Sequence, residues 1–306
     1  MKISVMEIGT NSIKFIIAEA NGEKSLKVID KCSTVNRLSR NMYNNNCICR
    51  ESIDSAVDII GEYMEMADKR KAPLVSIFST SVLRDAANRD EFIERVRLSY
   101  GINIEVISGE EEALLSYKAC SSLADARHKS FAVIDIGGGS TEISIGSKKS
   151  IERNISIDIG AVRLTETFIK NDPVDYEEIA GLSRHLIGVF QDAHLKDFKD
   201  MQLIGTGGTI KSVSTIHNKL DYKNEEKIHG SVISFDDIGF IFNFLAQLTV
   251  EKRKNLEGLN PKRADVIIAG TAILYGFMKK YGINEITVSS KGVIEAYVQQ
   301  YISSKF

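Results

Sequence analysis

Residues 133–146 read VIDIGGGSTEISIG, and the predicted fold of the chain is built outward from this stretch. An apolar run ends in the acid Asp135, three glycines follow, and alternating apolar residues resume after Glu142. This order predicts a strand, a tight turn and a second strand. Because glycine lacks a Cβ, backbone N–H groups in such a turn can approach a bound anion closely. The acid would repel a phosphate unless a cation lies between them, so the stretch favours a phosphate chain with Mg²⁺; a plain glycine hairpin is the alternative.

A second stretch near the N-terminus repeats this pattern. Residues 7–12 read EIGTNS, and they match DIGGGS at 135–140 in the acid, the isoleucine, the first glycine and the serine. An alternating apolar segment follows both stretches. The spacing of 128 residues is far too long for a solenoid repeat. It predicts two similar domains, each of which offers one phosphate-binding turn to a shared cleft.

The composition is that of an ordinary globular protein: 43% of the 306 residues are apolar, 26% are charged and the formal net charge is −2. This balance argues against general nucleic-acid binding. No run of 18 apolar residues is present, and the first residues lack the long apolar core of a signal peptide, so we expect neither a membrane span nor secretion. The four cysteines are scattered, which favours reduced thiols and a cytoplasmic location.

Both halves of the chain show the same order of patterns, three strands followed by helices that alternate with strands. In the first half we expect strands at about 2–8, 13–20, 24–33, 74–79 and 103–107, and helices at about 50–70, 88–100 and 109–123. In the second half we expect strands at about 130–136, 141–147, 150–157, 201–205 and 285–288, and helices within 160–194 and at about 208–217, 235–249, 263–280 and 291–303. The fold class is therefore α/β, with two duplicated domains at 1–125 and 126–306, each a mixed sheet flanked by helices.

Arg84 follows the hydroxyl-rich segment Ser79-Thr80-Ser81 at the end of a predicted strand. Ligands of open α/β sheets bind beyond the carboxyl ends of the strands. The planar guanidinium group can also hold two phosphate oxygens at once. We therefore expect Arg84 to bind phosphate, with a surface contact to Asp85 as the alternative.

Three consecutive acids, Glu110, Glu111 and Glu112, open the helix predicted at 109–123. The helix dipole favours acids in a first turn, which is a sufficient structural explanation for them. Ser108 and Glu111 have the spacing of a capping box, so Glu111 has a role in the helix start. Glu112 begins a buried face instead, and a carboxylate there could orient or deprotonate a water molecule.

A third glycine turn, Gly205 to Thr209, joins a predicted strand to a helix, whose N-terminus can bind an anion. The turn lacks the lysine of a P-loop, and no dinucleotide-binding motif is present. Three such turns favour phosphate chemistry, with independent structural turns as the alternative.

Two other segments are expected to be solvated surfaces. One is the polar loop 36–49, which could also fold over a substrate. The other consists of the basic runs 252–254 and 262–263, which could also bind a polyanion.

Seven motifs in order, EIGTNSIKFII, STSVLRDAAN, ISGEEEALLSY, VIDIGGGSTEISIG, DIGAVRLTETF, GTGGTIKSVS and PKRADVIIAGTAIL, resemble the exopolyphosphatase/guanosine pentaphosphate phosphohydrolase family. The resemblance runs over nearly the full length. It implies an actin-like (ribonuclease H-like) fold with a cleft between two domains and a last helix, about 291–306, that packs back on the first domain. It also implies hydrolysis of a terminal phosphate from polyphosphate or guanosine pentaphosphate, with Mg²⁺ or Mn²⁺ as the cofactor, and a homodimer.

The resemblance also assigns roles to residues. The catalytic glutamate corresponds to Glu112, the metal-linked acids correspond to Asp135 and Glu142, and our hypothesis places Mg²⁺ on Asp135 and Glu7 while Glu142 assists Glu112. The expected phosphate-binding residues are Gly9, Thr10, Asn11, Ser12, Arg84, Gly137, Gly138, Gly139, Ser140, Thr141, Gly207, Gly208 and Thr209.

Three features depart from the family pattern. The first motif usually begins with Asp, whereas this chain has Glu7, and SSKGVIEAY at 289–297 lacks the arginine that often follows its glycine. Longer members carry a helical extension beyond the position of Phe306, and this extension helps them to bind long polymers or to form dimers. Exopolyphosphatase activity is the expected function. Guanosine pentaphosphate 5'-phosphohydrolase activity, a non-hydrolysing nucleotide or polyphosphate sensor, and an actin-like kinase or ATPase are the alternatives.

Overall fold

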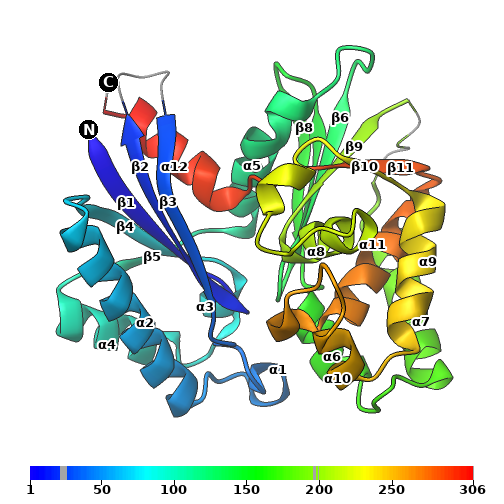
Figure 1. The fold of residues 1–306 in the computed structure, drawn as a ribbon, viewed down its shortest axis with the longest axis horizontal. Coiled ribbons are helices and arrows are strands. Elements are labelled where there is room, and N and C mark those ends of the chain that lie inside the picture. Colours follow the sequence, from blue (N-terminus) through cyan, green and yellow to red (C-terminus); the bar gives the residue numbers. More distant parts are fainter. Residues whose placement is uncertain (21–25, 196–197, 199, 306) are drawn as a thin grey trace. The chain divides into compact units, whose positions relative to one another are not determined.

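The computed structural model describes residues 1–20, 26–195, 198 and 200–305, and Figure 1 shows its helices and strands. The chain divides into two compact units. Unit 1 contains Met1–Leu115 and Val293–Phe306, and unit 2 contains Ser116–Gly292. The division falls inside a helix, ten residues before the boundary expected from the sequence, and the last helix is grouped with unit 1.

Unit 1 is built on a five-stranded mixed sheet of order β3-β2-β1-β4-β5. The strands are β1 (Lys2–Ile8), β2 (Ser12–Ala20), β3 (Leu26–Val35), β4 (Leu74–Ser79) and β5 (Ile104–Val106). The first three pair antiparallel, and β4 lies parallel to both β1 and β5. β1 and β2 are buried on both faces along most of their length, which is why their sequences are rich in isoleucine. The first two residues of the strand expected at 24–33 lie outside the described residues.

The helices of unit 1 cover this sheet (Figure 1). They are α1 (Met42–Asn45), α2 (Arg50–Lys69), α3 (Ser81–Asp85), α4 (Arg89–Tyr100), the start of α5 (Gly109–Cys120), and α12 (Val293–Ser303). α12 contacts β1 and β2. Its Tyr297 ring stacks on Phe78 at 4.3 Å between centroids, and its hydroxyl lies 2.6 Å from Glu105 and 2.9 Å from Ser76. These contacts attach the C-terminal helix to the unit that contains the N-terminus.

Unit 2 repeats the same plan with one extra strand. Its sheet has the order β10-β11-β9-β6-β7-β8. The strands are β6 (Phe131–Ile136), β7 (Thr141–Gly146), β8 (Ile151–Ile157), β9 (Gln202–Thr206), β10 (Val232–Ser234) and β11 (Glu285–Val288). The sequence did not predict β10, because three residues at a sheet edge are too few to show an alternating pattern.

The helices of unit 2 pack around α11, which is buried on nearly every side. The helices are α6 (Ala161–Phe168), α7 (Tyr176–Asp192), α8 (Gly208–His217), α9 (Phe235–Ala246), α10 (Val250–Lys254) and α11 (Ile267–Tyr281), with short 3₁₀ helices at Ser121–Leu123, Glu225–Ile228 and Pro261–Arg263. None of the helices in the described part of the chain has both the length and the apolar character needed to cross a membrane.

The duplication predicted from the glycine stretches is confirmed in atomic detail. Strands β1, β2, β3, β4 and β5 correspond to β6, β7, β8, β9 and β11 in order and direction. In unit 1 the Gly9 N–H donates to the Ser12 carbonyl at 3.0 Å, and in unit 2 the Gly137 N–H donates to the Ser140 carbonyl at 3.0 Å. The fold is therefore α/β with two duplicated domains, each a mixed sheet flanked by helices, as the sequence predicted.

Candidate active site

The turn between β1 and β2 presents polar side chains in a buried setting. A Cβ at Gly9 would lie 3.1 Å from the Ser12 carbonyl oxygen, so a larger residue would require the turn to shift by a few tenths of an ångström. The Thr10 hydroxyl lies 2.8 Å from the hydroxyl of Ser81, and both residues are buried. Asn11 is buried as well, and its Nδ2 has no hydrogen-bond partner within the described ranges. Asn11 can therefore donate to a ligand that enters this turn.

Residues 36–39 pack directly on this turn. The backbone N–H groups of Asn36 and Arg37 donate to the Asn11 carbonyl at 3.2 and 3.1 Å, and Ser39 donates to the Thr10 carbonyl through its N–H and its hydroxyl. Leu38 and Ser39 are fully buried. The solvated interpretation of this part of the loop was therefore wrong. A single apolar residue among polar neighbours anchors the segment, and composition alone does not reveal such an anchor.

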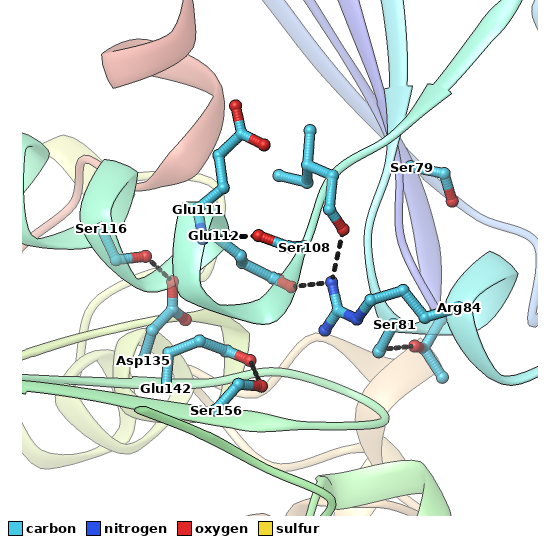
Figure 2. Close-up of polar contacts among 12 residues, drawn as sticks. Ser79, Ser81, Arg84, Ser108, Glu111, Glu112, Ser116, Asp135, Glu142 and Ser156 are labelled. Atoms are coloured by element: carbon cyan, nitrogen blue, oxygen red, sulfur yellow. Dashed lines mark hydrogen bonds and ion pairs between the residues drawn. The ribbon is translucent and has the colours of Figure 1, made fainter. Parts of the chain in front are cut away.

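Arg84 and Glu112 form an ion pair within unit 1. Arg84 lies in the last turn of α3 and donates from Nη1 to Glu112 Oε2 at 2.8 Å and to the Ile107 carbonyl at 3.1 Å (Figure 2). Glu112 lies in the first turn of α5 and is only 7% exposed. The adjacent positive charge favours the ionised carboxylate, which is the form that a general base requires.

The neighbouring residues of α5 behave as the sequence predicted. The Ser108 hydroxyl accepts from the Glu111 N–H at 3.1 Å, so the helix cap is confirmed. In Figure 2 the Glu111 side chain points away from Arg84, whereas Glu112 points toward it.

An open hollow of about 460 Å³ borders Arg84, and its other lining residues are Arg89, Asp90, Ile93, Val106, Ile107 and Ser108. A solvent-connected space therefore exists beside the guanidinium group.

Unit 2 places two acids opposite each other at the end of its central hairpin. Asp135 is the second-last residue of β6, Glu142 is the second residue of β7, and the two are direct cross-strand partners. The Ser116 hydroxyl donates to Asp135 Oδ2 at 2.5 Å, and the Ser156 hydroxyl donates to Glu142 Oε1 at 2.8 Å (Figure 2). Both acids are buried. The two serines orient the carboxylates, and the sequence analysis missed them both.

The glycine turn that joins these acids is supported by the start of α6. The Gly137 carbonyl accepts from the Ala161 N–H at 3.0 Å, and the Gly138 carbonyl accepts from the Val162 N–H at 2.9 Å. A side chain at Gly160 would overlap the Gly138 backbone. The first N–H groups of α6 therefore hold the turn in place, and the family motif around Gly160 has a structural role.

The third glycine turn lies against the same acid. Gly207 has φ +94°, and a Cβ there would lie 2.6 Å from Asp135 Oδ1. Glycine is thus required by its backbone conformation and by the close approach of the carboxylate. A side chain at Gly208 would overlap the guanidinium group of Arg263, which lies over the N-terminus of α8. Unit 2 therefore brings Asp135, two glycine turns and an arginine together.

The basic runs are not simply solvated faces. Arg263 lies at the third glycine turn, as described above, so its position supports anion binding. Arg253 is 2% exposed and pairs with Asp172 at 3.6 Å, so it belongs to the interior of unit 2. Lys252, Lys254 and Lys262 are exposed. The solvated interpretation was wrong for Arg253, and the choice between a solvated face and a polyanion-binding track stays a prediction for the exposed lysines.

Glu7 has a partner that the sequence analysis overlooked. Lys14 lies directly opposite Glu7 in the β1–β2 register, and its ammonium group donates to Glu7 Oε1 at 2.5 Å. The other oxygen of Glu7, Oε2, is buried and has no hydrogen-bond partner among the residues that the structure describes. Counting outward from the turn would have identified Lys14, because residues equally distant from a hairpin turn lie opposite each other.

The donor set suits a magnesium ion that is bound together with substrate. Among the described residues, no three His, Cys, Asp or Glu side chains converge as a closed metal cage. Mg²⁺ in phosphate-processing sites is instead held by one or two carboxylates, waters and substrate phosphates. Within unit 2, the hard oxygens of the cross-strand partners Asp135 and Glu142 fit this mode.

Comparison with known proteins assigns the class. The model of the Ppx/GppA phosphatase family matches residues 16–303. The chain therefore belongs to the Ppx/GppA phosphatase family, in agreement with the resemblance seen in its motifs.

Individual relatives agree with this assignment. The chain is 32% identical over 315 residues to a bifunctional 3-dehydroquinate synthase/phosphatase of Fusobacterium nucleatum, and the match covers 98% of the chain but 46% of that protein, about half its length. It is 28% identical over 312 residues to exopolyphosphatase 2 of Mycobacterium tuberculosis, with 96% of each protein covered. The crystal structure of the Aquifex aeolicus Ppx/GppA family member aligns with a TM-score of 0.81 at 28% identity, covering 100% of this chain and 98% of that one.

Proposed function

We propose that the chain is an exopolyphosphatase that releases terminal orthophosphate from inorganic polyphosphate by metal-assisted hydrolysis of a phosphoanhydride bond. The observation that carries the proposal is the pair of buried carboxylates beside glycine turns in unit 2, with a carboxylate–guanidinium pair in unit 1. Family membership supports it, since relatives similar over nearly the whole chain include exopolyphosphatase 2 of Mycobacterium tuberculosis.

Each unit contributes its own groups to the reaction. In unit 1, residues 9–12 and Arg84 would bind phosphate oxygens, and in unit 2, residues 137–141 and 207–209 would do so. Asp135 would hold Mg²⁺, and Glu7 would be a metal-linked acid only once substrate is bound, since Lys14 already occupies its Oε1. A bound Mg²⁺ neutralises phosphate charge as the bridging bond breaks. The preorganised backbone and guanidinium donors stabilise the charge that develops on the phosphate oxygens.

Glu112 acts on the attacking water. Its carboxylate accepts one proton as the water oxygen bonds to phosphorus, and the bridging oxygen leaves on the shortened polyphosphate. Arg84 orients the carboxylate through the 2.8 Å bond to Oε2 and keeps it ionised before the reaction. Glu142, which Ser156 orients, assists from unit 2.

The test is a comparison of phosphate release from short polyphosphate, long polyphosphate, guanosine pentaphosphate and ATP, each with and without Mg²⁺ and without any acceptor. Release from polyphosphate that depends on Mg²⁺ is the expected result. Faster release from guanosine pentaphosphate would favour the nucleotide phosphohydrolase instead. Binding without release at every Mg²⁺ concentration would favour a sensor, and transfer to an added sugar would favour a kinase.

A further inference from the structure

The two duplicated hairpins differ at one charged position. Glu7 and Lys14 are cross-strand partners in unit 1, and Asp135 and Glu142 are cross-strand partners in unit 2. The same spacing of 128 residues separates Glu7 from Asp135 and Lys14 from Glu142. The hairpin of unit 1 therefore carries one acid and one base, whereas its duplicate carries two acids.

The ion pair of unit 1 is partly shielded from water. Lys14 Nζ lies 2.5 Å from Glu7 Oε1, and the exposed fractions of the side chains are 30% for Lys14 and 6% for Glu7. A divalent cation on the same carboxylate would be repelled by the ammonium group at this range. The remaining oxygen, Oε2, can supply at most one ligand.

We propose that the ammonium group of Lys14 takes the place of a metal ion beside Glu7 in unit 1. In the substrate-free protein, divalent cations therefore bind only to the acid pair of unit 2. The inference rests on the proposed function for Asp135 as a metal-linked acid, and it adds the cross-strand partner Glu142 to the same metal site. It adds that the two duplicated hairpins have different roles before substrate binds. The hairpin of unit 2 binds the metal ion, whereas the hairpin of unit 1, whose Glu7 is neutralised by Lys14, presents its turn to the anion. One divalent ion per chain follows from this division.

The scaffold around Lys14 supports this interpretation. In β8, Ser156 lies opposite Glu142 and orients it by a hydrogen bond of 2.8 Å. In β3, Ser33 lies opposite Lys14 in the same relation. Unit 1 thus already has a hydroxyl residue at the position that orients the second acid in unit 2. Replacing Lys14 with an acid would therefore rebuild the pattern of unit 2 in unit 1.

The experiment counts bound Mn²⁺ in the substrate-free full chain by electron paramagnetic resonance of the free ion. We expect one equivalent in the unmodified protein and two in Lys14→Glu, with the second lost again when Glu7→Gln is added. Two equivalents in the unmodified protein would overturn the proposal. A single equivalent in folded Lys14→Glu would overturn it as well.

Controls address folding and charge. Lys14→Arg keeps the cation and should retain one equivalent, whereas the reverse exchange Glu142→Lys should bind none. If thermal melting shows that Lys14→Glu does not fold, Lys14→Gln replaces it: a second, weaker equivalent is expected, and its absence refutes the proposal. The count is independent of hydrolysis, so a protein that binds one Mn²⁺ but releases no phosphate would refute the proposed function alone.

Discussion

Glu112→Gln is the change that most directly tests the proposed mechanism. Glutamine has nearly the same shape, and its side-chain oxygen can still accept the hydrogen bond from Arg84 that Glu112 Oε2 accepts at 2.8 Å. The substitution removes the negative charge and the ability to accept a proton from water. Loss of a positioned general base costs a factor of about 10² to 10⁴ in rate, or about 3–5 kcal/mol of activation free energy. We therefore expect kcat to fall at least about a hundredfold while KM changes by less than about threefold.

The stability of this variant should change only slightly. The Arg84 guanidinium keeps a hydrogen-bond acceptor but loses its counter-charge, which costs on the order of 1–3 kcal/mol, and Tm should fall by only a few degrees. The assay is Mg²⁺-dependent phosphate release from polyphosphate, with substrate binding measured separately. Glu111→Gln is the matched control, because the same change is made one residue earlier on a side chain that points away from Arg84. Near-normal kcat in Glu112→Gln, or an equal loss in Glu111→Gln, would refute the assigned role.

Three further predictions concern unit 2. Ser116→Ala removes the 2.5 Å hydrogen bond to Asp135 and should raise the Mg²⁺ concentration for half-maximal activity about tenfold or more, with little change at saturating Mg²⁺. Gly207→Ala places a Cβ 2.6 Å from Asp135 Oδ1 at φ +94°, and kcat/KM for phosphate release should fall at least about tenfold. Burial, and secondly the charge of Lys291, lower the pKa of His229 from 6.5, so the unfolded chain binds more protons and the folded state loses stability as pH falls. His229→Gln should therefore lessen the drop in Tm between about pH 7.5 and about pH 5.5 measured by thermal melting.

Much of the fold could be predicted because its signals are local. Strands β1, β2, β6 and β7 carry strong apolar patterns, and glycine turns separate them at matching positions. The elements that escaped prediction were short. β10 has three residues and α3 has five, and segments of this length show no usable periodicity.

The candidate site was predictable in part. Glu112 could be singled out because the helix cap at Ser108 involves Glu111 and not Glu112. Asp135 could be singled out because a turn of three glycines follows it. Lys14 and Ser156 could have been found by counting the register outward from the hairpin turns. Ser116 and Arg263 had no such signal, because helix packing brings them to Asp135 and Gly208, 19 and 55 residues away in the sequence.

The sequence by itself determined the duplicated hairpins, their acids and their glycine turns. Each of these depends on neighbouring residues, whose side chains alternate between faces with a period of two and whose glycines permit close backbone approach. Only the tertiary structure decided which groups from distant elements contact the site carboxylates: Arg84 on Glu112 and Ser116 on Asp135. The physical reason is the short reach of these interactions. Hydrogen bonds and ion pairs act over about 3 Å in space, and residues far apart in the sequence come this close only when helices pack on the sheets.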